Sequence, residues 1–344
     1  MRLLVIANHV AFVRGGAEAH TQGLVRALQS AGHQADALRL PFCHRPASAI
    51  ESRMQAAQTL DLGPETDLGV DAVISLQFPG WGAQHPRHVA WILHQHRAAY
   101  ELFDAARAAP EEVDLRERIH AFDRAHLGAV RHRFANSRRV ADRLQNNLGL
   151  AAEPLYHPPP AAGQLAPGDS WGYIFCPSRL ESLKRQDLLI EAAARLREPV
   201  PILIAGEGGQ RARLQDTIHH LGLEHQVRLV GHLSEAEKRV AYAHALAVFF
   251  GPQDEDLGYV TLEAMLCGKP VITCTDSGGP LEFVRPGATG WVTEPDPEAV
   301  AEAISEAAAR PERTARMGRE ALSQYQALNL TWPRTVRRLL AALG

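Results

Sequence analysis

Short apolar runs alternate with amphipathic stretches from one end of the chain to the other. Most runs are uninterrupted and about 4–6 residues long, which is typical of parallel strands that helices cover on both faces. They predict strands at Leu3–Ala7, Ala72–Leu76, Val89–Leu93, Arg133–Ala135, Tyr173–Cys176, Ile202–Ala205, Val227–Val230, Ala247–Phe250 and Val271–Thr273. Helical spacing predicts helices between them, among them Ala17–Gln29, Arg138–Asn147, Gln186–Arg197 and Gln210–Leu221. This alternation predicts an α/β protein with doubly wound parallel sheets.

One segment interrupts the alternation. A stretch rich in Pro, Ala and Gly begins at His157 and runs to Gly168, and such a composition continues neither a helix nor a central strand. We therefore predict a linker there, between two Rossmann-like domains at residues 1–160 and 169–327. The tail, residues 328–344, again has a helical pattern, and we expect it to pack back on the first domain.

Composition and charge narrow the class of protein. The 344 residues are 46% hydrophobic and 22% charged, which excludes disorder, collagen and coiled coil as the main architecture. The net charge of -3 does not indicate a nucleic-acid binder. No apolar run is as long as a transmembrane helix. The four cysteines show no CxxC spacing, so we expect reduced thiols in a cytoplasmic protein. Residues 87–143 have more Arg than Asp and Glu, which fits a solvated face, an anionic acceptor or a membrane surface.

Glycines follow two of the predicted strands, where open α/β sheets bind their ligands. Gly15 and Gly16 lead from the first strand into a helix, and Gly206 and Gly208 follow the strand Ile202–Ala205. Glycine lets a ligand approach the backbone, and the free N–H groups of a helix start favour an anion. Neither segment has the dinucleotide-binding or P-loop pattern, and an ordinary tight turn explains each of them equally well.

His94 comes directly after the strand Val89–Leu93. It is either a polar group in a cleft or a residue that caps a helix. His94 and His96 also form an HxH pair, but no Cys or carboxylate nearby completes a metal site.

Two basic residues, Arg179 and Lys184, lie in the loop after the strand Tyr173–Cys176. Two cations there can neutralise a diphosphate, because Arg offers a planar fork of donors and Lys a point charge. Lys is a rare choice in this chain, which has only Lys184, Lys238 and Lys269. The alternative is that these side chains are surface charges paired with Glu181 or Asp187.

Two carboxylates, Glu255 and Glu263, stand eight residues apart after the strand Ala247–Phe250. We expect Glu255 in a loop and Glu263 in the following helix. Carboxylates only accept hydrogen bonds, so they suit the vicinal hydroxyls of a sugar or ribose. The alternative is a solvated acidic loop and an unrelated helical Glu.

Gly278 and Gly279 follow the strand Val271–Thr273 and precede Pro280. Proline at the first helical position would leave free N–H groups before it, which makes a second candidate nest for an anion. A plain helix start explains this segment equally well.

Taken together and in this order, these segments resemble the retaining glycosyltransferases of family 4, which have the two-domain GT-B fold. The resemblance covers essentially the whole chain and is most specific over residues 251–293. That segment contains the E-x7-E pair Glu255/Glu263, Gly268-Lys269-Pro270, Gly278-Gly279-Pro280 and Gly290-Trp291-Val292. The resemblance implies two Rossmann-like domains that face an interdomain cleft, the first on the acceptor side and the second binding the donor.

The resemblance also implies a nucleotide diphosphate sugar as donor. Arg179 and Lys184 would clamp its diphosphate, Glu263 would accept from the ribose hydroxyls, and Glu255 from the transferred sugar. His94 would touch the donor sugar near the reacting carbon. Further donor contacts are implied for Gly15, Gly16, Gly206, Gly208, Gly258, Tyr259, Val260, Gly278 and Gly279.

No cofactor and no metal is implied, because the two cations would replace the divalent ion that other sugar transferases use. The sequence does not identify the acceptor; the resemblance implies a hydroxyl on a glycan or a lipid-linked molecule, in the assembly of cell-surface polysaccharide, lipopolysaccharide or glycolipid, and a peripheral membrane contact would fit that role. The family often has a small residue after the first Glu, whereas this chain has Asp256. Two other classes fit the pattern: a GT-B epimerase that acts on a nucleotide sugar, and a non-catalytic binding module.

Overall fold

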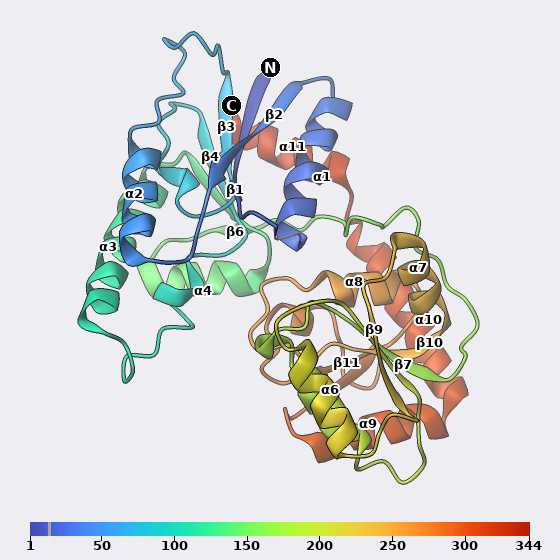
Figure 1. The fold of residues 1–344 in the computed structure, drawn as a ribbon. Coiled ribbons are helices and arrows are strands. Elements are labelled where there is room, and N and C mark those ends of the chain that lie inside the picture. Colours follow the sequence, from blue (N-terminus) through green and yellow to red (C-terminus); the bar gives the residue numbers. More distant parts are fainter. Residues whose placement is uncertain (13–14) are drawn as a thin grey trace. The chain divides into compact units, whose positions relative to one another are not determined.

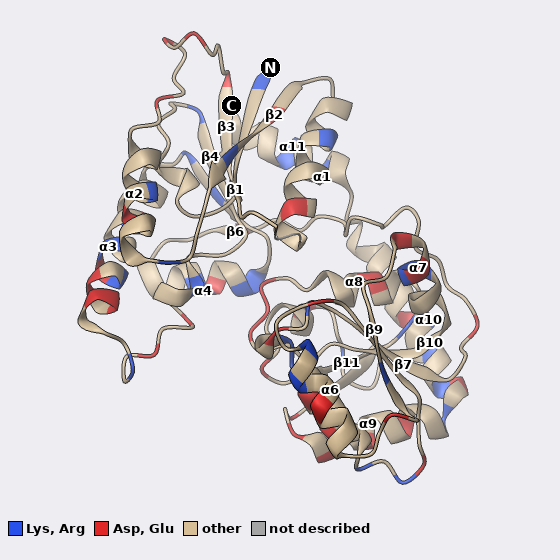
Figure 2. Ribbon diagram, viewed as in Figure 1, with Lys and Arg blue, Asp and Glu red and all other residues tan. Residues whose placement is uncertain are grey.

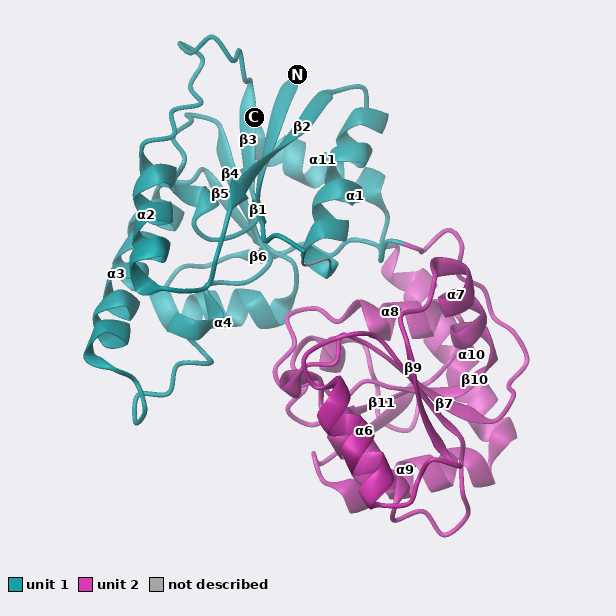
Figure 3. Cartoon of the chain, in the orientation of Figure 1, with its two compact units in different colours: residues 1–160, 330–344 teal, residues 161–329 magenta. Residues whose placement is uncertain are grey.

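The computed structural model describes residues 1–12 and 15–344 and consists of two compact units (Figure 3). Unit 1 comprises Met1–Pro160 and Leu330–Gly344, and unit 2 comprises Ala161–Asn329. Val13 and Arg14, within the predicted first glycine loop, lie outside the described residues. No helix in these ranges has both the length and the apolar composition of a membrane-spanning segment.

Unit 1 is built on a six-stranded parallel sheet of order β2-β1-β3-β4-β5-β6 (Figure 1). Its strands are β1 (Arg2–His9), β2 (Gln34–Pro41), β3 (Ala72–Ser75), β4 (His88–Ile92), β5 (His132–Ala135) and β6 (Glu153–Pro154). Its helices are α1 (Gly16–Ser30), α2 (Ala47–Gln58), α3 (Pro110–Ala129), α4 (Arg138–Leu148) and α11 (Trp332–Leu343). Every residue of β3 and β4 is buried, as expected for strands with helices on both faces.

The C-terminal helix α11 completes the core of unit 1. Its residues Val336, Leu339 and Leu343 are buried in the cluster that also contains Leu24 and Leu28 of α1. These α11 positions recur at helical spacing, so one stripe of the helix is apolar and the rest is polar. Burial of that stripe fixes the end of the chain on unit 1.

Unit 2 has a second six-stranded parallel sheet, of order β12-β11-β10-β7-β8-β9. Its strands are β7 (Tyr173–Pro177), β8 (Ile202–Ala205), β9 (Val227–Gly231), β10 (Ala245–Phe249), β11 (Val271–Cys274) and β12 (Gly290–Thr293). Its helices are α5 (Gln186–Ala193), α6 (Arg211–His220), α7 (Glu235–His244), α8 (Tyr259–Leu266), α9 (Pro297–Ala309) and α10 (Pro311–Leu328).

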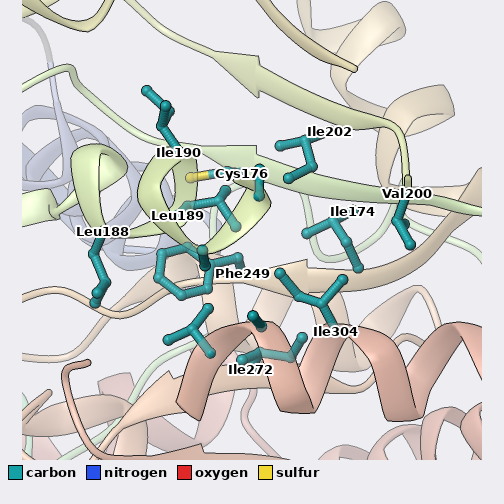
Figure 4. Packing of buried hydrophobic residues seen from close by; sticks show 14 of the residues in the cluster. Ile174, Cys176, Leu188, Leu189, Ile190, Val200, Ile202, Phe249, Ile272 and Ile304 are labelled. Atoms are coloured by element: carbon teal, nitrogen blue, oxygen red, sulfur yellow. The ribbon is translucent and has the colours of Figure 1, made fainter. Parts of the chain in front are cut away.

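Alternate residues of the unit 2 strands face two separate cores. Ile174, Ile202 and Phe249 face a cluster that Leu189 of α5 and Ile304 of α9 complete (Figure 4). The opposite face forms a second cluster around the fully buried Phe175 and Tyr242. Burial on both faces explains why these strands read as continuous apolar runs.

The strand order of unit 2 identifies where a ligand would bind. The chain runs outward from β7 to β8 and β9, and then returns to the other side of β7 with β10. In open α/β sheets, ligands bind at such a switch point, beyond the carboxyl ends of the two strands. A ligand of unit 2 is therefore expected at the loops after β7 and β10.

The doubly wound α/β fold class is confirmed, but three strands were not predicted: β2, β6 and β12. In β2 polar and apolar residues alternate and its side chains are mostly half-buried or exposed, because β2 is an edge strand. The strand β6 has only two residues, and β12 is a short edge strand. Edge strands lack the continuous apolar run on which the prediction depended.

Candidate functional site

Lys184 and Glu255 come together at the switch point of unit 2. Lys184 lies in the 3-10 turn Ser182–Lys184 after β7, and Glu255 lies in the loop after β10. The Lys184 ammonium contacts Oε2 of Glu255, and it also lies 5.5 Å from the ring centroid of Phe250. The two charged side chains are 16% and 20% exposed, so solvent screens this ion pair only in part.

The loop that carries Glu255 is held by main-chain hydrogen bonds to the loop after β11. The N–H of Glu255 donates to the carbonyl of Ser277 at 2.9 Å, and the N–H of Gly279 donates to the carbonyl of Glu255 at 2.8 Å. The expectation that Gly278 and Gly279 both present free N–H groups is therefore wrong at Gly279. Gly278 follows a buried serine, Ser277, whose hydroxyl accepts from the N–H of Cys274 at 3.1 Å.

The loop that carries Arg179 rests directly on the glycine turn after β8. A Cβ atom at Gly206 would lie 1.9 Å from the Ser178 carbonyl oxygen, and one at Gly208 would lie 2.4 Å from that of Leu180. Both glycines also have positive φ angles, 139° and 159°. Only glycine fits there without displacing the backbone, so these residues position the Arg179 loop.

Arg179 itself is exposed and has no side-chain partner among the described residues. The alternative that it pairs with a neighbouring carboxylate is not what the structure shows. Asp187 instead contacts Arg213 at 3.0 Å, and Arg185 makes a bidentate ion pair with Asp276. The guanidinium of Arg179 is thus available to an anion.

Glu263 is buried in α8, with 5% of its surface exposed, and the protein itself supplies its partners. The hydroxyl of Tyr242 donates to Oε2 at 2.7 Å, and Nζ of Lys238 lies 3.6 Å from Oε1. Burial raises the pKa of Glu263, and the charge of Lys238 and the Tyr242 hydroxyl oppose that rise. To bind ribose hydroxyls as well, the Glu263 carboxylate oxygens would have to accept further hydrogen bonds beside those contacts.

Gly258, Tyr259 and Val260 form the start of α8. Gly258 precedes the helix with a φ of 81°, and Tyr259 and Val260 are its first two residues. N–H groups in the first turn have no acceptor within the helix, so this end of α8 attracts negative charge. Only three residues, Asp256, Leu257 and Gly258, separate the first residue of α8 from Glu255.

The candidates of the first domain, Gly15, Gly16 and His94, all lie in unit 1. Gly15 precedes α1 in extended conformation, and Gly16 is the first residue of that helix. His94 follows β4, is half-buried, and its Nδ1 lies 2.7 Å from the carbonyl oxygen of Gln95. Its contact with a donor sugar remains a prediction.

Unit 1 also gathers basic groups at the carboxyl ends of its strands. His44 and His96 stack with ring centroids 6.2 Å apart, and burial lowers the pKa of His96 to about 4. Two arginines, Arg138 and Arg139, open α4, where the ribbon in Figure 2 is coloured blue. Burial therefore favours the neutral form of His96 at this edge of unit 1.

Sequence reasoning did not predict several residues that hold the site together. Gln186 is 1% exposed, and its amide donates to the Ser178 hydroxyl at 2.6 Å and to the Arg179 carbonyl at 3.0 Å. Tyr242 and Lys238 support Glu263 from a different helix. Each of these residues lies within a helix and outside any recognisable motif, so no local pattern could have identified it.

Comparison with known proteins gives the same family for this part of the chain. Residues 164–324 match the family model described as "Glycosyl transferases group 1". The D-inositol 3-phosphate glycosyltransferase of Gordonia bronchialis is 35% identical over 179 residues, which cover 48% of this chain and 38% of that protein. The GDP-mannose-dependent alpha-(1-6)-phosphatidylinositol monomannoside mannosyltransferase of Mycolicibacterium smegmatis is 34% identical over 205 residues, 56% of this chain and 48% of that protein. The chain thus spans less than half the length of these curated relatives.

Solved structures extend the likeness of the fold to the whole chain. The sucrose-phosphate synthase of Thermosynechococcus elongatus has a TM-score of 0.79 at 18% identity, over 99% of this chain and 100% of that chain. The Anabaena protein HepE in complex with UDP-glucose has a TM-score of 0.72 at 17% identity, over 100% and 99% of the two chains. Residues 164–324 therefore match the glycosyl transferases group 1 family, and the described chain has the two-domain GT-B fold.

Proposed function

We propose that this protein is a retaining, metal-independent hexosyltransferase. It takes the sugar from a nucleotide diphosphate donor, which unit 2 binds, and transfers it to a hydroxyl of a glycan or lipid-linked acceptor. The reaction belongs to cell-surface glycan assembly on the cytoplasmic side of the membrane. The names of the relatives support this proposal, since one is an inositol phosphate glycosyltransferase and another uses GDP-mannose.

The contact between Lys184 and Glu255 is the observation that carries the proposal. It brings a cation and a carboxylate, which can accept hydrogen bonds from sugar hydroxyls, to one point beyond the carboxyl ends of β7 and β10. A nucleotide sugar presents both complementary groups, a diphosphate and sugar hydroxyls, a few bonds apart. The contact with the Glu255 carboxylate also holds the Lys184 ammonium in place before the donor arrives.

The chemistry assigned to these residues follows from where charge develops. As the bond between the anomeric carbon and the diphosphate breaks, negative charge grows on the leaving oxygen. Lys184 and the unpaired guanidinium of Arg179 stabilise that charge, and fixed cations stabilise it more than mobile water does. Glu255 accepts from a hydroxyl of the transferred sugar and so holds the anomeric carbon in place.

Product analysis tests the proposal. The protein is incubated with UDP-, GDP- and ADP-hexoses, with and without polyol, glycan and lipid-linked acceptors, and the products are followed by NMR. We expect an α-linked glycoside from an α-linked donor, in the presence of EDTA, and a loss of turnover in Lys184→Met. A rearranged nucleotide sugar without acceptor would indicate an epimerase, and donor binding without any turnover would indicate a binding module. Either result would overturn the proposal.

A further inference from the structure

Unit 2 has an apolar pocket of about 660 Å³ at the opposite ends of its strands from Lys184 and Glu255. Residues at the start of β7, β8 and β9 line it, including Tyr173, Ile202 and Arg228, and α7 forms its other wall. The candidate donor site follows the carboxyl ends of β7 and β10, whereas this pocket lies at the amino ends of β7 to β9. It is therefore a separate feature of the unit.

The pocket exists because α7 covers only part of its face of the sheet. The helix packs on β10 and β7 and leaves the surface of β8 and β9 beside it open. Leu203 of β8 lies opposite Arg228 of β9 in the strand register. On the helix side, Val240 is 49% exposed. Apolar surface of this kind, in a concavity of this volume, is characteristic of sites for small apolar ligands.

Two polar groups in the pocket lack partners. Gln226 is 6% exposed, and its Nε2 makes no hydrogen bond to any part of the chain that the structure describes. A buried donor without an acceptor is rare and costly in a folded protein. Arg228 is exposed, and its guanidinium has no partner among the described residues. Glu237, which also lines the pocket, is already engaged because it accepts from the N–H and hydroxyl of Ser234.

We propose that this pocket binds the aliphatic chain of an amphiphile with an anionic head group. The chain lies on Leu203 and against Val240, while an acceptor atom of the head group satisfies the amide of Gln226 and the negative charge pairs with Arg228. An apolar ligand without an acceptor would leave Gln226 unpaired, and a cationic one would meet Arg228 with like charge. The site thus selects for charge as well as for apolar length.

Titration with dodecanoate below its micellar concentration tests this site, with dodecyltrimethylammonium as the ligand of opposite charge. Trp171 lines the pocket and is 66% exposed, while Trp81 and Trp91 are buried, so bound ligand shifts Trp171 emission to shorter wavelength. Calorimetry measures affinity independently. We expect saturable binding of dodecanoate and at least tenfold weaker binding of the cation. Equal affinity for the two amphiphiles, or no binding, overturns the proposal.

Variants separate this site from non-specific adsorption. Val240→Asp places a charge in the pocket wall and should abolish binding, whereas Val113→Asp, at a helix position of unit 1 that is 39% exposed, should not change it. Arg228→Gln should weaken dodecanoate about tenfold, as expected for loss of a charge-assisted hydrogen bond. Gln226→Met removes the unpaired donor, so it should weaken binding without lowering the melting temperature. Unchanged affinity in Val240→Asp, or a Gln226→Met protein that melts earlier yet binds normally, contradicts the proposal.

Discussion

The ammonium of Lys184 contacts the carboxylate of Glu255 across 71 positions of sequence. Lys184→Met should lower kcat/KM for transfer by about 10²–10³-fold, because it removes a fixed charge from the site where the diphosphate departs. Arg213→Met is the matched control, since it breaks the exposed ion pair with Asp187 and should leave kcat/KM unchanged. Steady-state kinetics with the donor identified by the nucleotide panel make the comparison. Equal losses in both variants would mean that the effect is not specific to this ion pair.

The glycine turn after β8 should be intolerant of any side chain. Gly208→Ala would place a Cβ atom 2.4 Å from the Leu180 carbonyl oxygen at a φ of 159°, so we expect a loss of stability of at least about 2 kcal/mol and weaker nucleotide binding. Gly209→Ala is the control, because nothing lies within 4 Å of its Cβ position. Urea unfolding and nucleotide titration measure the two effects. If Gly208→Ala is as stable as Gly209→Ala, the turn does not constrain the Arg179 loop.

Substitutions of Glu263 distinguish its place in the fold from a role at the ribose. Glu263→Gln keeps an acceptor for the Tyr242 hydroxyl, whereas Glu263→Leu leaves that hydroxyl unpaired and should be less stable by about 2 kcal/mol. The Gln variant should nevertheless bind the nucleoside diphosphate more weakly than wild type, because a charged acceptor of ribose hydroxyls has been lost. Thermal unfolding and calorimetric titration give the two readouts. Normal nucleotide affinity in Glu263→Gln would restrict this residue to a structural role.

A buried carboxyl in unit 1 should make stability depend on pH. Asp123 is fully buried, accepts from Trp81 Nε1 at 2.9 Å and from the Tyr100 hydroxyl at 2.8 Å, and burial raises its pKa to about 7. The folded state then binds more protons than the unfolded state between about pH 4 and pH 7. The contribution of the Asp123 carboxyl to the free energy of unfolding is therefore fully present below about pH 4 and is lost as the pH rises to about 7.

Buried histidines with a lowered pKa, such as His96, make the free energy of unfolding rise with pH and so oppose the effect of Asp123. Comparison with Asp123→Asn isolates the effect of Asp123, because the histidines are present in both proteins. The unfolding free energy of wild type minus that of the variant should fall between pH 4 and pH 7, by an amount on the order of a few kcal/mol. Urea unfolding at several pH values measures the difference. A difference that rises with pH would mean that Asp123 is ionised when folded, with its charge stabilised.

Removal of divalent ions should leave transfer unchanged. Arg179 and Lys184 are proposed to supply the positive charge at the leaving diphosphate, so EDTA should not lower kcat by as much as twofold. The double variant Arg179→Gln/Lys184→Met, with MgCl2 added back, shows whether a metal can replace the two side chains. An EDTA-sensitive wild type that recovers with Mg²⁺ would remove the metal-free part of the proposal.

The sequence by itself determined the type of fold. Continuous apolar runs such as Ala72–Leu76 and Ile202–Ala205 predicted central parallel strands, because a strand buried on both faces must be apolar on both. The order of the motifs after residue 250 predicted the family whose model residues 164–324 match. Both signals come from residues that are close together in the chain, so a single sequence is enough to recognise them.

Only the tertiary structure decided which candidate groups meet and which are already engaged. It paired Lys184 with Glu255, gave Glu263 the hydroxyl of Tyr242 and used the N–H of Gly279 within the protein. Among residues 1–12 and 15–344 it gave the side chain of Arg179 no partner. It also left one face of β8 and β9 open beside α7. Each of these outcomes depends on strand order and on contacts between segments far apart in the chain, because hydrogen bonds and ion pairs form between whichever groups packing brings together. A sequence read position by position contains no measure of that distance.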